Sequence, residues 1–136
     1  MSNGLDRRSS PGANAAPDIV ARTFQFGLSI VRLADTFDSS RETRRVILRQ
    51  LIRSGTSVGA NVEEAQAAES KADFIHKMAI AQKEARESRY WLKLLAQVEE
   101  RAREPLGSAL DESDQLVRIL SSITLSARRN ARPHHS

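Results

Sequence analysis

Apolar residues recur every three or four positions along most of the chain, which is the period of an α-helix. The first helix is predicted to begin after Asp18, a favourable N-cap residue, and to run to about Phe37. It carries two adjacent apolar stripes, one of Val20, Phe24, Gly27, Val31 and Ala34, and one of Ile19, Thr23, Phe26, Ile30, Leu33 and Phe37. A turn is predicted to follow at 38–40.

The second helix passes through a stretch that resembles a loop by composition, residues 54–59 (SGTSVG). The helical phase nevertheless continues across it, in Ile47, Leu51, Ser54, Val58, Val62 and Ala65. We therefore predict one helix from about 41 to 68, with a break at 54–59 as the alternative. Glycine costs ~1 kcal/mol relative to alanine inside a helix, so we expect Gly55 and Gly59 to allow close approach of a neighbouring helix.

The third and fourth helices have clear apolar seams. The third begins with Ser70-x-x-Asp73, which is close to a capping box. Its seam alternates spacings of four and three, as in left-handed bundles: Phe74, Met78, Ala81, Ala85, Ser88, Leu92 and Leu95. The fourth helix is expected to have Pro105 in its first position, where proline is favourable. Its seam is Leu106, Leu110, Ser113, Val117, Leu120, Thr124 and Ala127.

Short connections between these helices predict an all-α protein, an antiparallel up-down-up-down four-helix bundle. The chain has 136 residues, which suits one domain, and we place that domain at 17–128. Residues 1–16 are small, polar and interrupted by glycine and proline, and they predict a disordered N-terminal arm. Residues 129–136 predict a disordered basic C-terminal tail.

Composition excludes several classes of protein. The chain has no cysteine, which excludes disulfides and thiolate–metal sites and fits a reducing compartment. No apolar run approaches the ~20 residues of a membrane helix. The N-terminus also lacks the apolar segment of a secretory signal. We therefore expect a cytoplasmic protein with no membrane partner.

Residues with catalytic chemistry do not gather into a motif. His76 is the only histidine inside the predicted domain, and Asp73-x-x-His76 occurs once, whereas a di-metal bundle needs two such pairs. The hydroxyls of Ser54, Thr56 and Ser57 have no base beside them in the motif. No glycine-rich phosphate loop is present. We predict that the chain is not an enzyme and holds neither a metal nor a cofactor.

A row of arginines at the start of the second helix is the most suggestive feature: Arg41, Arg44, Arg45, Arg49 and Arg53, opposed only by Glu42. Cations in the first turn of a helix oppose its dipole, so we interpret the row as a candidate nucleic-acid-binding site. The alternative is a solvated face that pairs with neighbouring acids. Aromatic residues make up 4% of the chain, so binding is expected to be backbone-directed and sensitive to salt. A further alternative is the basic tail with Arg128, Arg129 and Arg132.

The third helix also has a second apolar set, about 100° around the helix from its seam. This set consists of Ile80, Tyr90, Trp91, Leu94 and Val98. A lone four-helix bundle buries one stripe per helix, which would leave this set in water. We therefore predict that it forms an oligomer interface.

Three segments carry a family resemblance: 22–26 (RTFQF), 53–65 (RSGTSVGANVEEA) and 73–95 (DFIHKMAIAQKEARESRYWLKLL). Over about 18–125 the chain resembles the four-helix-bundle family of 23S rRNA intervening-sequence proteins. The accessory variability protein of diversity-generating retroelements is related to this family. The resemblance implies an up-down bundle that assembles into a homopentameric ring. It also implies nucleic-acid binding, as in some members, and no enzymatic activity.

Together these features predict a non-enzymatic, oligomeric helical bundle. Its expected partners are further copies of itself, RNA or DNA, or a nucleic-acid enzyme such as a reverse transcriptase. The alternative is a protein-binding structural scaffold with no nucleic-acid role. Salt-dependent retention of labelled RNA or DNA would distinguish the two.

Overall fold

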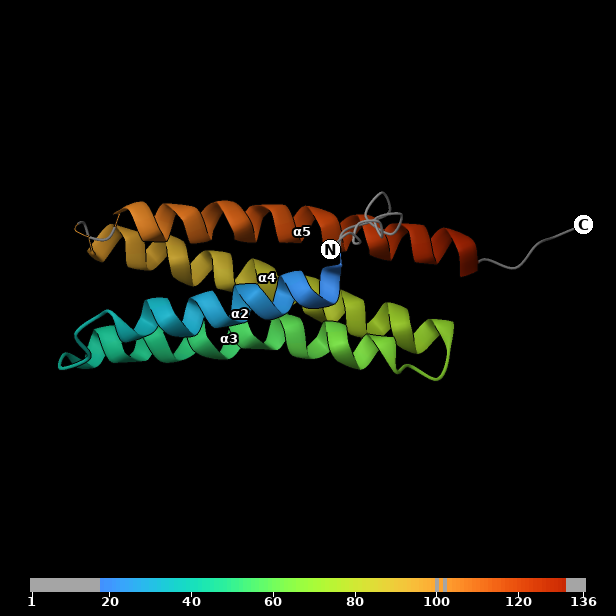
Figure 1. Ribbon diagram of the computed structural model, residues 1–136, viewed down its shortest axis with the longest axis horizontal. Helices are drawn as coiled ribbons and strands as arrows, with labels where there is room; N and C mark the ends of the chain where they lie inside the picture. Colours follow the sequence, from blue (N-terminus) through green and yellow to red (C-terminus); the bar gives the residue numbers. More distant parts are fainter. Residues whose placement is uncertain (1–17, 100, 102, 132–136) are drawn as a thin grey trace, which may run out of the picture.

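The structure is a computed structural model that describes residues 18–99, 101 and 103–131. Four helices make up nearly all of this part: α2 (Ile19–Asp35), α3 (Glu42–Gln66), α4 (Lys71–Val98) and α5 (Arg103–Ala131). Figure 1 shows them as one elongated bundle in which consecutive helices run in opposite directions. The predicted all-α four-helix bundle is therefore confirmed. None of the described helices is long and apolar enough to cross a membrane.

Two helices begin at the predicted capping residues. The Asp18 carboxylate accepts hydrogen bonds from the backbone N–H groups of Val20 at 3.1 Å and Ala21 at 3.2 Å. The Ser70 hydroxyl accepts one from the N–H of Asp73 at 3.0 Å. These bonds satisfy donors that have no partner inside the helix, which stabilises both helix starts.

The boundaries of the last helix differ from the prediction. α5 begins at Arg103, so Pro105 is its third residue and not its first. Proline is tolerated there because the first four N–H groups of a helix have no intrahelical partner. α5 also continues past residue 128 to Ala131, and its basic last turn suits the negative end of the helix dipole. The predicted arm at 1–16 and the end of the predicted tail at 132–136 lie outside the described residues.

α3 runs without interruption through its glycines, which confirms one continuous helix and excludes a break at 54–59. α2 packs directly against these positions. A Cβ atom on Gly55 would stand 3.0 Å from the Ile30 side chain, and one on Gly59 would stand 3.1 Å from the carbonyl oxygen of Thr23. The glycines therefore allow the close approach of helices that the sequence predicted.

The core follows the predicted seams closely. The buried residues of the α4 seam are Met78, Ala81, Ala85, Ser88, Leu92 and Leu95. In α2 the stripe through Ile30 and Leu33 is buried, but Phe24 and Val31 of the other stripe are 57% and 37% exposed. These two side chains lie at an open groove beside Gly59 and Ala60 of α3, so part of the second stripe stays in solvent.

Arg22 ties α2 to α5 where the two helices approach. Its Nε atom donates to the Glu112 carboxylate at 2.8 Å, and an Nη atom donates to the Gln115 side chain at 2.8 Å. The hydrogen bond to Glu112 raises the pKa of Arg22 above its ordinary value. A polar bridge therefore reinforces the sparse contact between α2 and α5.

Candidate nucleic-acid interface

The five arginines predicted as a binding row all lie on or next to the first half of α3, but they differ in their partners. Arg44 pairs with Glu99 at the end of α4, and its Nη1 atom donates to the carbonyl oxygen of Asp38 at 2.9 Å. The side chains of Arg44 and Glu99 are only 21% and 16% exposed. Because this partly buried pair joins two helices, Arg44 belongs to the bundle itself.

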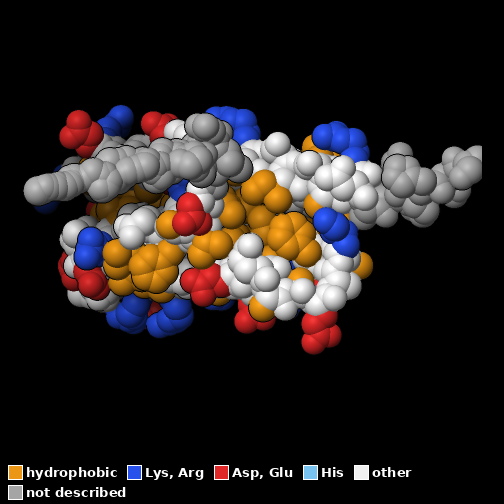
Figure 2. Space-filling view, turned by 45° about the vertical axis from the view of Figure 1, so that its right-hand side comes forward, with side chains coloured by type: hydrophobic (Ala, Val, Ile, Leu, Met, Phe, Trp, Pro, Cys, Tyr) orange, Lys and Arg blue, Asp and Glu red, His pale blue; other side chains and the backbone are white. Residues whose placement is uncertain are grey.

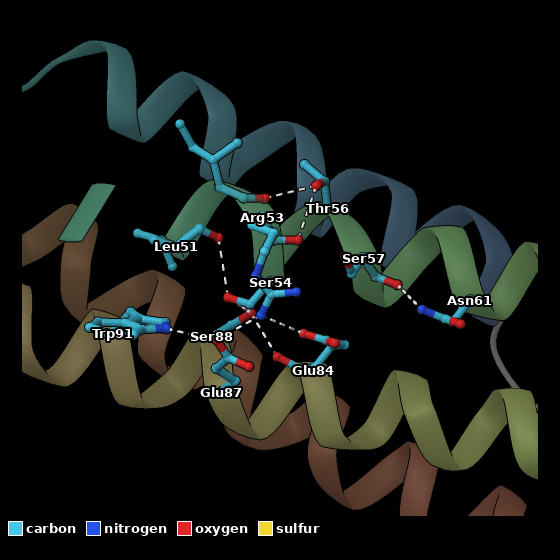
Figure 3. Close-up of polar contacts among 11 residues, drawn as sticks. Leu51, Arg53, Ser54, Thr56, Ser57, Asn61, Glu84, Glu87, Ser88 and Trp91 are labelled. Atoms are coloured by element: carbon cyan, nitrogen blue, oxygen red, sulfur yellow. Dashed lines mark hydrogen bonds and ion pairs between the residues drawn. The ribbon is translucent and has the colours of Figure 1, made fainter. Parts of the chain in front are cut away.

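Arg53 is held by two carboxylates of α4, as Figure 3 shows. An Nη atom of Arg53 lies 3.1 Å from Glu84 Oε1 and 2.7 Å from Glu87 Oε2. Glu87 also accepts a hydrogen bond from Trp91 Nε1 at 3.0 Å. The hydrogen bonds from Arg53 and Trp91 hold the pKa of Glu87 below its usual value. The hydrogen bonds to Glu87 and Glu84 in turn raise the pKa of Arg53. Arg53 therefore also serves the contact between α3 and α4.

The acidic partners of Arg53 were not predicted from the sequence. Glu84 is 6% exposed and lies four residues before Ser88, on the core side of α4. Ser88 Oγ donates to the backbone carbonyl of Glu84 at 2.9 Å and lies 3.1 Å from Ser54 Oγ. A carboxylate at a buried helix position needs a cation beside it. The position of Glu84 next to the α4 seam is the sequence signal that could have indicated its pairing with Arg53.

Arg41, Arg45 and Arg49 are exposed and, among the described residues, form no salt bridge with another helix; we call these three residues the exposed row. Arg53 is also 48% exposed, but its guanidinium is engaged by α4. The side chain of Arg45 is 44% exposed; it donates to the carbonyl oxygen of Ser39 at 3.0 Å and pairs with Glu42. Arg41 and Arg49 are exposed and form no salt bridge with any carboxylate in the described part of the chain. Neighbouring members are about 6 Å apart along the helix axis. The exposed row is therefore accessible to an external anion.

An open groove of about 540 Å³ borders the exposed row on the side of α2. It is lined by Ala34, Asp35, Phe37, Ser39, Arg45, Leu48, Arg49, Ile52 and Arg53. Figure 2 shows basic side chains along the lower left edge, where the first half of α3 lies in Figure 1, with hydrophobic side chains directly above them. The groove thus combines a positive rim with a largely apolar floor.

The predicted oligomer interface on α4 is partly covered by the bundle itself. Ile80, Trp91 and Leu94 are half-buried, because α3 packs along this side of α4. Tyr90 and Val98 are 57% and 56% exposed. The Tyr90 ring meets the Trp91 ring edge to face, with the centroids 5.0 Å apart. The expectation that a single bundle leaves the whole set in water is therefore wrong for Ile80, Trp91 and Leu94. It holds for Tyr90 and Val98.

The residues considered for catalysis or metal binding are scattered or engaged by the backbone. His76 is exposed, and the described residues contain no group of three His, Cys, Asp or Glu side chains that could hold a metal. The hydroxyls of Ser54 and Thr56 donate to carbonyls of their own helix at 3.3 and 2.7 Å.

Comparison with known proteins places this architecture in a family. No curated protein matches the chain. A solved structure from Bacteroides thetaiotaomicron, described as a protein with unknown function from the S23 ribosomal protein family, is 40% identical to the chain with a TM-score of 0.71. The similarity covers 78% of this chain and 97% of that chain. Residues 17–122 match the family described as 23S rRNA-intervening sequence protein, and the chain belongs to that family.

Proposed function

We propose that this chain is a non-enzymatic helical-bundle protein that binds the phosphate backbone of RNA or DNA in the cytoplasm. The exposed row, Arg41, Arg45 and Arg49, provides the contact. The observation that carries the proposal is the spacing and exposure of these arginines along one side of α3. Guanidinium groups bind phosphate through paired hydrogen bonds, and a regular row of them suits a repeating backbone.

The ion pairs of Arg44, Arg45 and Arg53 support the choice of Arg41, Arg45 and Arg49 as the binding residues. Arg45 pairs with Glu42, whose side chain is 70% exposed. A surface pair of this kind contributes only a few tenths of a kcal/mol, so a phosphate can replace Glu42 as the partner of Arg45. If Arg44 or Arg53 turned toward a phosphate, each would leave a partly buried carboxylate without its cation, which is costly. We therefore assign Arg44 and Arg53 to the fold.

Contacts to the backbone carry little sequence information, so binding is expected to be weakly specific and strongly dependent on salt. The name of the family, 23S rRNA-intervening sequence protein, links its members to ribosomal RNA and agrees with this proposal.

The proposal includes self-association into a homo-oligomer, with the five-membered ring that the family resemblance implies. Exposed apolar side chains on two helices support it, Tyr90 and Val98 on α4 and Phe24 and Val31 on α2. Head-to-tail contacts that close a ring would cover such surfaces on every copy. An oligomer also repeats the exposed row, so that several weak contacts act together on one strand or on a nucleic-acid enzyme that carries it, such as a reverse transcriptase.

A protein-binding structural scaffold is the second candidate function. The observation that favours it is an apolar groove of about 350 Å³ between α2 and α3, next to Phe24 and Val31. A further copy of this chain is the occupant that fits the scaffold function. In that case the bundle would assemble without any affinity for nucleic acid.

Fluorescence anisotropy with a short labelled RNA or DNA tests the proposed function. We expect Arg41→Gln, Arg45→Gln and Arg49→Gln together to weaken binding at least about tenfold, because three phosphate contacts are lost. A matched control removes three exposed cations of α4, Lys83→Gln, Arg86→Gln and Lys93→Gln, and should bind nearly as the wild type does. An equal loss in both variants would mean that overall charge and not the row decides binding. No binding by the wild type at about 100 µM would favour the scaffold.

A further inference from the structure

The groove beside the exposed row offers an apolar surface as well as positive charge. Its floor includes Phe37, Leu48 and Ile52, of which Ile52 is 36% exposed. Arg45 and Arg49 stand on its rim. Its volume of about 540 Å³ falls within the range of small-molecule sites, about 300–1,000 Å³.

A nucleic-acid duplex would leave this floor unused, because its bases are paired and stacked inside. An unpaired nucleotide instead carries a negative phosphate together with a flat, largely apolar base face that gains by leaving water. Figure 2 shows the same combination on the protein, with hydrophobic side chains next to basic ones. The groove therefore matches a nucleotide with an unpaired base better than it matches a duplex.

We propose that this groove accepts the unpaired base of a nucleotide within a single strand, while Arg45 and Arg49 hold the neighbouring phosphates. This inference rests on the proposed function and specifies the nucleic acid as single-stranded. The Asp35 carboxylate and the Ser39 side chain line the same groove and offer acceptors for the N–H groups of a base edge. The scarcity of aromatic residues predicts contacts to the phosphate backbone alone. The half-buried ring of Phe37 adds a surface on which a base can pack.

The direction of the exposed row agrees with an extended strand. Arg41, Arg45 and Arg49 follow one another at about 6 Å along α3, a step that successive phosphates of an unstacked strand also span. A base between two such phosphates would face the groove between α3 and the end of α2, whose floor includes Ile52 of α3 and Phe37, two residues after α2. One strand lying along α3 thus reaches both the rim and the floor.

The test compares a single strand with the duplex of the same sequence, using labelled RNA and the full-length protein. We expect the single strand to bind about tenfold more tightly or better, the effect of about one productive base contact. Equal or tighter binding of the duplex would overturn this inference and leave the proposed function standing. If neither form binds, both fail. An unlabelled mononucleotide should displace the strand only near millimolar concentration, and displacement at micromolar concentration would assign the groove to free nucleotides and overturn the single-strand proposal.

A pair of variants places the base contact in the groove. Ile52→Gln removes apolar floor from an exposed helix position and should weaken single-strand binding roughly fivefold without changing duplex binding. Val46→Gln is the matched control, because Val46 lies on the same helix with a similar exposure of 40% and does not line the groove. Circular dichroism checks that both variants remain helical. No loss with Ile52→Gln, or an equal loss with Val46→Gln, would overturn the inference.

Discussion

At the scale of single residues, Arg49 and Arg53 lie one turn apart on α3 and yet have different surroundings. Arg53 faces α4, where Glu84 and Glu87 accept its hydrogen bonds. Both arginines line the groove, but none of the described carboxylates forms a salt bridge with Arg49. Arginine therefore stabilises the bundle at position 53 and is available to a ligand at position 49.

The pair of Arg53 with Glu87 predicts a dependence of stability on pH. The pKa of Glu87 is lowered from its ordinary 4.5, so the stabilisation is complete above that value and is lost as the pH falls through the lowered pKa. Trp91 is the only tryptophan and donates to Glu87, so its fluorescence reports this step. In Arg53→Gln we expect the acid-induced change in fluorescence to begin at higher pH, because the pKa of Glu87 returns toward 4.5. An unchanged titration would show that Arg53 does not hold Glu87.

At the scale of the helices, periodicity was a sufficient guide wherever contacts are local. The seam of α4 and the continuity of α3 through Gly55 and Gly59 were predicted, because each depends on residues of one helix. The exposure of Phe24 was not predicted, because it depends on how far α2 is covered by its neighbours. The predicted start of α5 at Pro105 was two residues late, because the position that proline favours most does not alone decide where a helix begins.

The helix contact at Gly59 can be tested against a glycine without neighbours. A Cβ atom at Gly59 would meet the backbone of Thr23 at 3.1 Å, whereas one at Gly107 of α5 would meet nothing within 4 Å. We expect Gly59→Ala to lower the free energy of unfolding by up to ~2 kcal/mol. The cost of overpacking, ~1–3 kcal/mol, exceeds the ~1 kcal/mol gained by helix propensity, because backbone atoms cannot move aside easily. Gly107→Ala should raise it by up to ~1 kcal/mol through helix propensity. Urea unfolding measures both, and a stabilised Gly59→Ala variant would contradict the close contact.

At the scale of the whole molecule, the binding surface depends on contacts that a sequence does not display. The pairs of Arg44 with Glu99 and of Arg53 with Glu84 join residues 55 and 31 positions apart. The five arginines could be found from their spacing, but the three that form no ion pair with carboxylates at α4 could not be chosen without knowing the position of α4. The groove likewise needs the end of α2 beside α3.

Self-association is a further property of the whole molecule. Light scattering is expected to give a mass several times 15.1 kDa, because exposed apolar side chains on α2 and α4 gain by being covered. Phe24→Ser and Tyr90→Ser each remove an aromatic ring that is 57% exposed and should shift the protein toward the monomer. Val46→Ser serves as the control at a third surface. A wild-type monomer at micromolar concentration would end the oligomer proposal.

The central claim divides the arginines into the exposed row and the two, Arg44 and Arg53, that pair with carboxylates at α4. The salt dependence of RNA binding tests this division most directly. In the plot of log affinity against log salt, Arg41→Gln with Arg45→Gln should give a slope shallower by up to ~0.7 per lost single-strand contact. Arg53→Gln, which removes an arginine already engaged by Glu84 and Glu87, should leave the slope unchanged. A slope that changes with Arg53→Gln, or that stays the same without Arg41 and Arg45, would contradict the account.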